Sequence, residues 1–305
     1  MRTIVFGTAV ACLALCWACG DAEPELEIQS TTQKDILGPP SGLPYFGTYT
    51  LTQPYGEPGS LFVKYPSDDV RFGTEFDSGQ DEWDLIYLGA LVELEQVSSS
   101  RYLDAYEDSS HDYNAVTRSS QDDGTQYWFF RKSGAAYTIQ QWRSERYLDA
   151  YESSHDHSVV TRTKQSNDTQ RWSLSCGPWP TDPCTIRQVS TGRYLDAYAS
   201  SNDHSVVTRE YQDNDTQKWN LRYIGPVYAA YNKIGYLDAY ESGTFQAVVR
   251  SYQENGSQMW LFHAQDTVHP WYSITQMSSQ RQLVPFGSYA NTAPFPGPWV
   301  VTPVQ

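Results

Sequence analysis

Residues 146–172 read RYLDAYESSHDHSVVTRTKQSNDTQRW, and three further stretches of the chain repeat this segment closely. The repeats occupy residues 101–128, 193–219 and 235–260. Each copy places an aspartate directly after a leucine, and these aspartates are 45, 47 and 42 residues apart: Asp104, Asp149, Asp196 and Asp238. A period of this length is typical of proteins built from stacked copies of one supersecondary unit.

Two weaker copies flank the four clear ones. Trp83 lies 45 residues before Trp128, and Trp299 lies 39 residues after Trp260. We therefore predict six repeat units of about 40–47 residues, which fill the chain from residue 45 to residue 305.

Each unit is composed of short segments with β-strand character. In the third unit these are residues 137–142, 146–151, 158–162 and 171–174. They are rich in β-branched and aromatic residues and are separated by Ser, Asn, Asp and Gly. Because no segment shows a long helical period, the sequence predicts an all-β protein.

The N-terminus has the layout of an export signal. A positive start is followed by an apolar stretch that is too short to span a membrane, so residues 1–19 are predicted to be a signal peptide. Cys19 is a candidate lipidation site, and cleavage near Ala22 is the alternative. Residues 20–44 are predicted to be a flexible linker. We expect a cell-surface or outer-membrane lipoprotein, otherwise a secreted protein, that reaches a membrane only through this N-terminal lipid.

Residues 176–184 read CGPWPTDPC and interrupt the repeat after its third copy. In an exported chain, an even pair of cysteines favours a Cys176–Cys184 disulfide over two free buried thiols. Because prolines stiffen the backbone, residues 178–184 are predicted to connect two domains, at residues 45–177 and 185–305.

The net charge of the chain argues against some classes of binding partner. A net charge of −15 at pH 7 argues against nucleic acid, whose phosphates require a basic surface. It also argues against an anionic membrane surface. The 23 tyrosines and 10 tryptophans suit neutral, hydroxyl-rich ligands better.

A second dipeptide pattern completes the repeat. In the four clear copies, Leu-Asp is followed 20–22 residues later by Gln-x-Trp. This combination resembles the ricin-type (QxW) β-trefoil lectins, and the short unit is similar to that of actinohivin, a bacterial mannose-binding member. The resemblance implies three units per trefoil, hence two tandem β-trefoils, and a carbohydrate-binding lectin rather than an enzyme. The units lack the cysteine pair of ricin and have no aromatic residue at its stacking position, so the identity of the sugar does not transfer.

The Gln-x-Trp residues are predicted to be structural. An indole N–H and a glutamine amide can hydrogen-bond the backbone inside a β-rich core. The residues concerned are Gln126, Trp128, Gln170, Trp172, Gln217, Trp219, Gln258 and Trp260.

Sugar contacts are predicted at the other recurring polar positions. The resemblance assigns them to the aspartates, whose carboxylates can accept two hydroxyl groups, with turn capping as the alternative. A tyrosine two residues later could supply an apolar platform, or could instead pack between units. The loop beyond it and the polar residues after the next strand would form the rim, unless they are plain solvated turns. The predicted sugar-binding residues are Asp104, Tyr106, His111, Gln121, Asp149, Tyr151, His155, Gln165, Asn167, Asp196, Tyr198, Asn202, Gln212, Asn214, Asp238 and Tyr240.

The arginines that end the next strand are expected to form salt bridges with the aspartates of their own units. They are Arg118, Arg162, Arg209 and Arg250. The end units lack the aspartate, so we predict two sites in each trefoil. The fourth site would be weakened, because residues 243–245 replace the His-Asp loop there.

The sequence carries no recognisable catalytic, metal or cofactor motif: no asymmetric acid pair, G-x-S-x-G or H-E-x-x-H occurs. The predicted function is multivalent recognition of glycans or glycoproteins. One alternative is a non-catalytic adhesive or protein-binding trefoil scaffold at the cell surface. Another is a six-bladed propeller lectin, because six four-stranded units could also close into one ring. The oligomeric state is left open.

Overall fold

The computed structural model describes residues 37–39, 43, 45–54, 59–64, 67–74, 76–179, 181–265 and 271–304. The predicted signal peptide with Cys19, and most of the predicted linker, lie outside these residues. The described residues form 22 strands and six 3-10 helices, which confirms the all-β prediction. No helix among them is long and apolar enough to cross a membrane.

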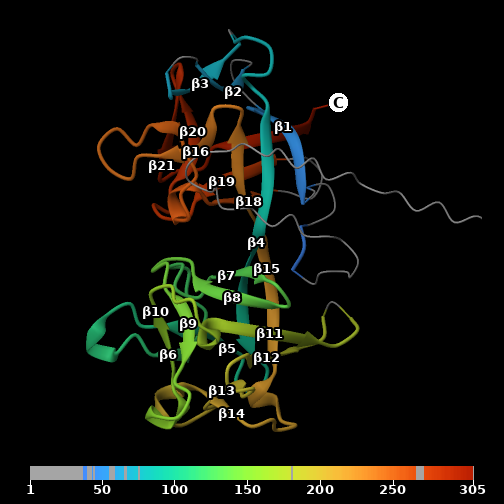
Figure 1. The fold of residues 1–305 in the computed structure, drawn as a ribbon, viewed down its shortest axis with the longest axis vertical. Coiled ribbons are helices and arrows are strands. Elements are labelled where there is room, and N and C mark those ends of the chain that lie inside the picture. Colours follow the sequence, from blue (N-terminus) through green and yellow to red (C-terminus); the bar gives the residue numbers. More distant parts are fainter. Residues whose placement is uncertain are drawn as a thin grey trace, which may run out of the picture.

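The strands are grouped into two lobes, stacked along the long axis of the molecule (Figure 1). We call residues 90–221 the insert lobe, and residues 43–85 together with 228–304 the split lobe. The insert lobe contains β5 (Arg101–Ala105), β6 (Ala115–Arg118), β7 (Trp128–Ser133), β8 (Ala136–Gln141), β9 (Tyr147–Ala150), β10 (Val159–Arg162), β11 (Arg171–Cys176), β12 (Cys184–Gln188), β13 (Tyr194–Ala197) and β14 (Val206–Arg209). The split lobe contains β1 (Phe46–Thr52), β2 (Ser60–Val63), β3 (Val70–Gly73), β16 (Gly235–Ala239), β17 (Ala247–Arg250), β18 (Trp260–Ala264), β19 (Trp271–Gln276), β20 (Gln282–Phe286), β21 (Tyr289–Ala293) and β22 (Pro298–Pro303). The short helices lie in loops: η1 (Ser109–His111), η2 (His155–His157), η3 (Asp168–Gln170), η4 (Asn202–His204), η5 (Asp215–Gln217) and η6 (Gly256–Gln258).

Two long strands join the lobes. β4 (Trp83–Gln96) and β15 (Trp219–Asn232) pair antiparallel along most of their length, with register shifts on either side of Gly225. The chain leaves the split lobe along β4 after its first unit, builds the insert lobe, and returns along β15 (Figure 1).

Each lobe has its own buried core. One core combines residues 43–85 with residues 228–301, and the other spans residues 90–219 with Leu37 packed on it. These cores divide the chain differently from the predicted domains at residues 45–177 and 185–305. The insert lobe holds the second, third and fourth units, and the split lobe holds the fifth, sixth and first.

The segment at residues 176–184 is a hairpin inside the insert lobe rather than a connector. β11 and β12 pair antiparallel with Cys176 opposite Cys184, and the expected disulfide joins these two residues. The prolines therefore occupy a closed hairpin loop, and the passage between lobes is made by β4 and β15 instead.

In three of the units, a buried amide side chain forms hydrogen bonds to the unit before it. Gln141 Nε2 donates to the carbonyls of Ala105 and Thr125, at 3.3 and 2.8 Å. Gln188 links the fourth unit to the third in the same way, and Gln276 links the sixth to the fifth.

Two further amides close the rings. Gln96 in the second unit donates to Ala197 and Thr216 of the fourth, at 2.7 and 2.8 Å. Asn232 in the fifth unit donates to Gln80 and Glu82 of the first. Each ring therefore closes after three units, as in a trefoil, and the alternative of one six-bladed ring is wrong.

The recurring tryptophan has the same contact in all six units. Its Nε1 donates at 2.8–3.2 Å to a leucine carbonyl of the same unit: Trp83 to Leu61, Trp128 to Leu103, Trp172 to Leu148, Trp219 to Leu195, Trp260 to Leu237 and Trp299 to Leu283. All six indoles are buried. This confirms the six units, including the two weak copies.

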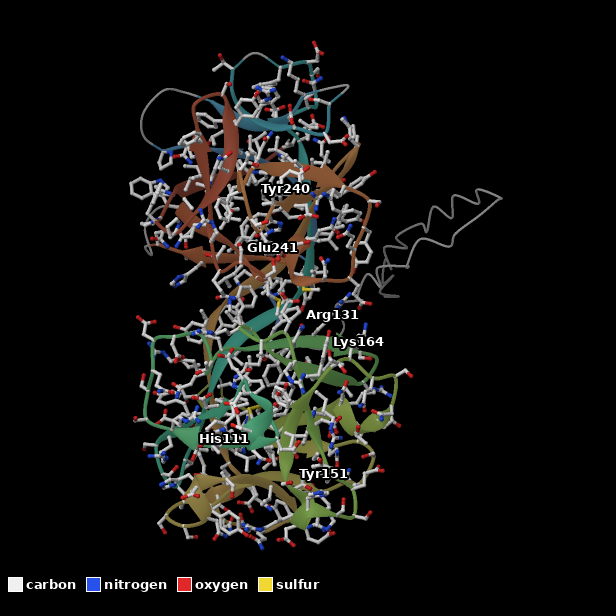
Figure 2. The ribbon with its side chains drawn as sticks, turned by 90° about the vertical axis from the view of Figure 1, so that its left-hand side faces the viewer. His111, Arg131, Tyr151, Lys164, Tyr240 and Glu241 are labelled. Atoms are coloured by element: carbon white, nitrogen blue, oxygen red, sulfur yellow. A yellow bond between two sulfur atoms is a disulfide. The ribbon has the colours of Figure 1, made fainter. Side chains whose placement is uncertain are left out.

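A third buried cluster fills the junction between the lobes and contains Phe129, Trp142, Met259 and Met277. Glu254 of the split lobe forms ion pairs with Arg131 and Lys164 of the insert lobe, at 3.0 and 2.6 Å. Figure 2 shows both basic residues on the side of the insert lobe that faces the split lobe.

The division into lobes predicts which fragments fold. Residues 88–223 expressed alone are expected to fold, because they contain three consecutive units and the Gln96 amide that closes them. Residues 185–305 alone are expected to stay unfolded, because they lack the first unit and separate the fourth from its ring. Circular dichroism and tryptophan fluorescence during heating measure both, and a cooperative transition of the 185–305 fragment would contradict this division.

Closure of the insert lobe is expected to depend on Gln96. Gln96→Ala leaves two carbonyls without their donor, at a cost of about 1–3 kcal/mol for each buried group. Urea denaturation should show this loss. The matched control is Gln53→Ala, because Gln53 Nε2 finds no hydrogen-bond acceptor in the described part of the chain. Equal losses in the two variants would argue against the closing role.

Candidate functional site

The four repeated aspartates lie inside the protein. None has exposed surface, and each forms an ion pair with the arginine at the end of the following strand. The distances from Arg Nη1 to Asp Oδ2 are 3.1 Å for Arg118–Asp104, 3.4 Å for Arg162–Asp149, 3.2 Å for Arg209–Asp196 and 3.4 Å for Arg250–Asp238. The salt bridges expected from the sequence are confirmed.

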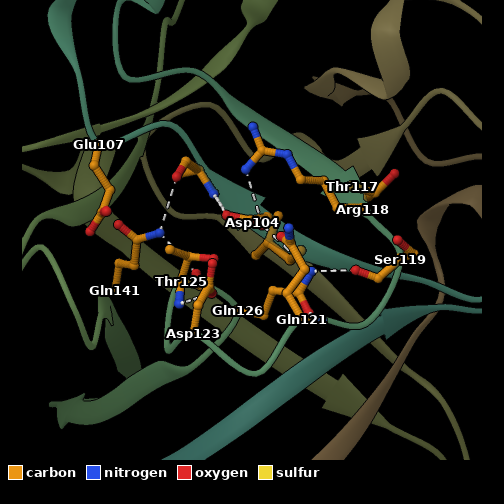
Figure 3. A network of polar contacts seen from close by, with 12 residues as sticks. Asp104, Glu107, Thr117, Arg118, Ser119, Gln121, Asp123, Thr125, Gln126 and Gln141 are labelled. Carbon is orange, nitrogen blue, oxygen red and sulfur yellow. Dashed lines mark hydrogen bonds and ion pairs between the residues drawn. The ribbon is translucent and has the colours of Figure 1, made fainter. Parts of the chain in front are cut away.

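Neighbouring polar groups surround these carboxylates (Figure 3). Asp104 Oδ1 accepts the backbone N–H of Ala105 at 2.6 Å, and Gln126 Nε2 lies 3.5 Å from Asp104 Oδ2. Burial raises the pKa of Asp104 above its usual value, and the charge of Arg118 opposes this rise. The carboxylate is held between the arginine and the core.

The glutamine of Gln-x-Trp also organises the loop in front of it. Gln126 Nε2 donates to the Ser119 carbonyl at 2.8 Å, and its Oε1 accepts the Gln121 N–H at 2.8 Å. Gln170, Gln217 and Gln258 repeat both contacts. These contacts support the structural role predicted for them.

A tyrosine covers each arginine. The guanidinium carbon lies 4.3–4.6 Å from the ring centroid in the pairs Arg118–Tyr106, Arg162–Tyr151, Arg209–Tyr198 and Arg250–Tyr240. Such contacts are attractive because the ring face is electron-rich. We call each set of aspartate, arginine and tyrosine a module, of which the chain has four.

The modules differ at the tyrosine ring. His111 stacks on Tyr106 with centroids 4.1 Å apart, and His155 stacks on Tyr151 at 4.2 Å. Asn202 takes the place of this histidine in the fourth unit, and the fifth unit has a shorter loop. Tyr240 is 45% exposed, whereas the other three tyrosines are half-buried. The module expected to be weakest therefore offers the most open ring.

The backbone conformation of the His-Asp loops explains why His, Asp and Asn occur there. His155, Asp156 and His157 have φ between 51 and 57°, and the same left-handed turn recurs at residues 202–204. Asn, Asp and His tolerate this conformation better than other non-glycine residues. Tyr113, in the loop of the second unit, also has a left-handed φ, and the guanidinium carbon of Arg146 lies 3.6 Å from the centroid of its ring.

The predicted rim residues are exposed and hydrogen-bonded within their own loop. Asn167 Nδ2 donates to Gln165 Oε1 at 3.0 Å, and Asn214 donates to Gln212 at 2.9 Å. In the second unit, Gln121 lies on the loop that follows Arg118 (Figure 3).

The groups that a ligand can reach are therefore the arginine and the tyrosine. The guanidinium side chains keep 27–34% of their surface exposed, whereas the aspartates keep none. In this conformation the carboxylate orients the arginine, and a sugar hydroxyl could reach it only after the arginine moved. The arginines were not among the predicted sugar contacts, although their recurrence in register with the aspartates carried the signal.

The modules are distributed unevenly between the lobes. Those of Asp104, Asp149 and Asp196 belong to the insert lobe, and that of Asp238 belongs to the split lobe. The expectation of two per trefoil is wrong, because ring closure joins the first and sixth units to the fifth. Figure 2 shows Tyr151 and His111 on one lobe and Tyr240 on the other. No cluster of three or more potential metal ligands occurs among the described residues.

Comparison with known families gives one match. Residues 80–164 match the family described as ricin-type beta-trefoil lectin domain-like. The chain is similar to this family over these residues, which lie mainly in the second and third units. A comparison with curated proteins found no match.

Several solved structures are similar at low identity. The designed threefold-symmetric protein ThreeFoil is 22% identical, with 43% of this chain and 97% of that chain covered and a TM-score of 0.39. The Macrolepiota procera ricin B-like lectin, in complex with lactose, is 18% identical, with 49% and 99% covered and a TM-score of 0.36. The Polyporus squamosus lectin, bound to a human-type influenza-binding epitope, is 15% identical, with 45% and 50% covered and a TM-score of 0.40.

Removing one buried carboxylate is expected to destabilise the lectin-like domain. Asp149→Ala leaves Arg162 without its ion-pair partner and removes one of the acceptors of Gln170, and breaking a buried ion pair costs about 3–5 kcal/mol. Urea denaturation measures the loss, and Glu152→Ala removes an exposed carboxylate of the same unit as a control. If the two variants were equally stable, the ion pair would not hold the module.

Proposed function

We propose that this protein binds carbohydrate without catalysis, through the four modules. The observation that carries the proposal is the arginine–tyrosine pair that recurs at the surface of four units, two of them within the ricin-type lectin-like match. A recurring pair of hydrogen-bond donor and apolar ring suits a ligand that itself repeats.

The chemistry of the pair fits a sugar. A guanidinium offers several N–H donors in a fixed fork, which suits neighbouring hydroxyl oxygens. The part of the tyrosine ring left uncovered offers apolar surface to the C–H groups of a pyranose, and the O–H can donate or accept. Because the aspartate fixes the arginine in advance, little conformational freedom is lost on binding.

Multivalent recognition of glycans or glycoproteins follows from the number of modules. Each surface module buries little of a ligand, so single contacts are expected to be weak. Linked sites raise the overall avidity by about 10²–10⁴ when the ligand reaches several at once. Three modules on the insert lobe make that lobe the main binding surface of the proposal.

Export completes the proposal. The signal-peptide pattern of residues 1–19, with Cys19 as the lipidation candidate, would place the modules at a cell surface, or in the medium after cleavage near Ala22. The expected partners are found in the same compartments.

A glycan array tests the function with the protein starting at residue 20, which keeps Leu37 and Leu43 in the two cores. We expect binding to one sugar class. The triple variant Tyr106→Ala, Tyr151→Ala and Tyr198→Ala should lose most of it, because it removes all three platforms of the insert lobe. Each single variant should weaken avidity only modestly. Trp179→Ala is the control, since Trp179 is 70% exposed and belongs to no module.

The outcomes separate the candidate functions. If the triple variant folded and still bound glycans, the modules would not be the binding sites. A folded protein that binds no glycan would favour the protein-binding scaffold instead.

A further inference from the structure

The first unit has a cavity at the position where the second to fifth units have a module. It measures about 730 Å³, within the range of roughly 300–1,000 Å³ of small-molecule sites. It is lined by Phe62, Phe72, Phe76, Lys64 and residues around them, and Ser288 of the sixth unit closes one side. The two end units, which carry no module, thus meet at this cavity.

The register shows how the cavity arises. Leu61 and Leu103 are equivalent, because the carbonyl of each accepts the indole N–H of its unit's tryptophan at 3.0 Å. One position later, Phe62 replaces Asp104.

The other two module positions are changed as well. Lys64 stands at the position of Tyr106, three residues beyond the equivalent leucine. Phe72 pairs with Leu61 as Thr117 pairs with Leu103, so Gly73 replaces Arg118. The side chains that fill this space in other units are absent, and the space is left open.

Three phenylalanines form the apolar part of the cavity wall, beside polar side chains. Phe62 packs on Phe76 with centroids 5.3 Å apart, and Phe72 packs edge-on against Trp299. The β20–β21 hairpin adjoins the cavity, because the Phe72 N–H donates to the Ser288 carbonyl at 3.2 Å. Phe286, at the tip of this hairpin, is 67% exposed. Such rings suit the apolar face of a ring-shaped ligand.

Two of the charged side chains that line the cavity have ionic or hydrogen-bond partners, although Arg71 Nε finds no acceptor among the described residues. Arg71 forms an ion pair with Asp69 at 2.9 Å and covers the Tyr289 ring at 3.6 Å. Asp77 accepts Gln80 Nε2 at 3.2 Å, within its own turn.

Lys64 differs from both. It is exposed and forms no ion pair with any residue that the structure describes. An ammonium group at an aromatic wall suits an anionic group on a ligand that also has an apolar face.

We propose that this cavity is a second ligand site that takes an acidic sugar, with the carboxylate at Lys64 and the ring against Phe62 and Phe76. The inference rests on the proposed function, because it assumes a carbohydrate ligand, but it uses none of the module residues. It assigns the two end units a binding role of different chemistry, in which charge selects the sugar.

Titration with D-glucuronate tests the site, with D-glucose as the neutral match, in the protein starting at residue 20. Calorimetry and saturation-transfer NMR measure binding. We expect glucuronate to bind more tightly than glucose, and Lys64→Gln to weaken it about fivefold, the upper range for an exposed ion pair. Phe76→Ala should weaken it about tenfold through the lost ring contact. Raising the salt concentration to about 0.5 M should weaken glucuronate binding to the unsubstituted protein but not to Lys64→Gln, because salt screens exposed charges.

The controls keep this site distinct from the modules. Lys218→Gln removes one positive charge in the insert lobe and should leave glucuronate affinity unchanged, as should the triple tyrosine variant. If only the triple variant lost glucuronate binding, the cavity would not be the binding site, and the proposed lectin function would still hold. Benzoate that bound more tightly than glucuronate would overturn the sugar class. The modules could bind no glycan while glucuronate binding still depended on Lys64. This result would support the cavity as a ligand site and contradict the proposed role of the modules.

Discussion

The architecture depends on one recurring buried contact, in which an amide side chain of one unit donates to two carbonyls of the unit before it. A buried carbonyl without a donor costs free energy, so each unit requires a neighbour in a fixed position. Gln96 satisfies carbonyls of the fourth unit and Asn232 those of the first, and these two contacts determine which units share a ring. The order of units along the chain and their order in space therefore differ.

The consequence is a lobe inserted within a lobe. The two crossings between rings use β4 and β15, and pairing these strands satisfies their backbone groups along most of their length. The junction cluster and the ion pairs of Glu254 then bury the surface between the lobes. Three of the four modules fall on one lobe because this topology places the two units without a module, the first and the sixth, together in the split lobe.

Local features were predictable from the sequence, and long-range pairing was not. The tryptophans, the Gln-x-Trp glutamines and the aspartate–arginine pairs recur at fixed spacing, so the repeat alone indicated their roles. Residues 176–184 were misread as a connector because proline and cysteine mark a rigid loop without saying whether its strands pair with each other or diverge. The partner of Gln96, some 100 residues along the chain, leaves no local signal. The burial of the aspartates also could not be predicted, because the same sequence pattern would fit an exposed or a buried aspartate.

The first unit shows how such a scaffold can change its chemistry. Its leucine–tryptophan hydrogen bond and strand register match those of the other units, so the fold tolerates new side chains at the three module positions. A buried ion pair contributes little net stability compared with apolar residues of similar volume, because desolvation of both charges offsets their attraction. Replacing Asp and Arg together by Phe62 and Gly73 avoids an unpaired buried charge, whereas replacing the arginine alone would leave a buried carboxylate without its partner. The scaffold can therefore exchange a polar module for an aromatic cavity only when both members of the pair change, and the first unit shows both changes.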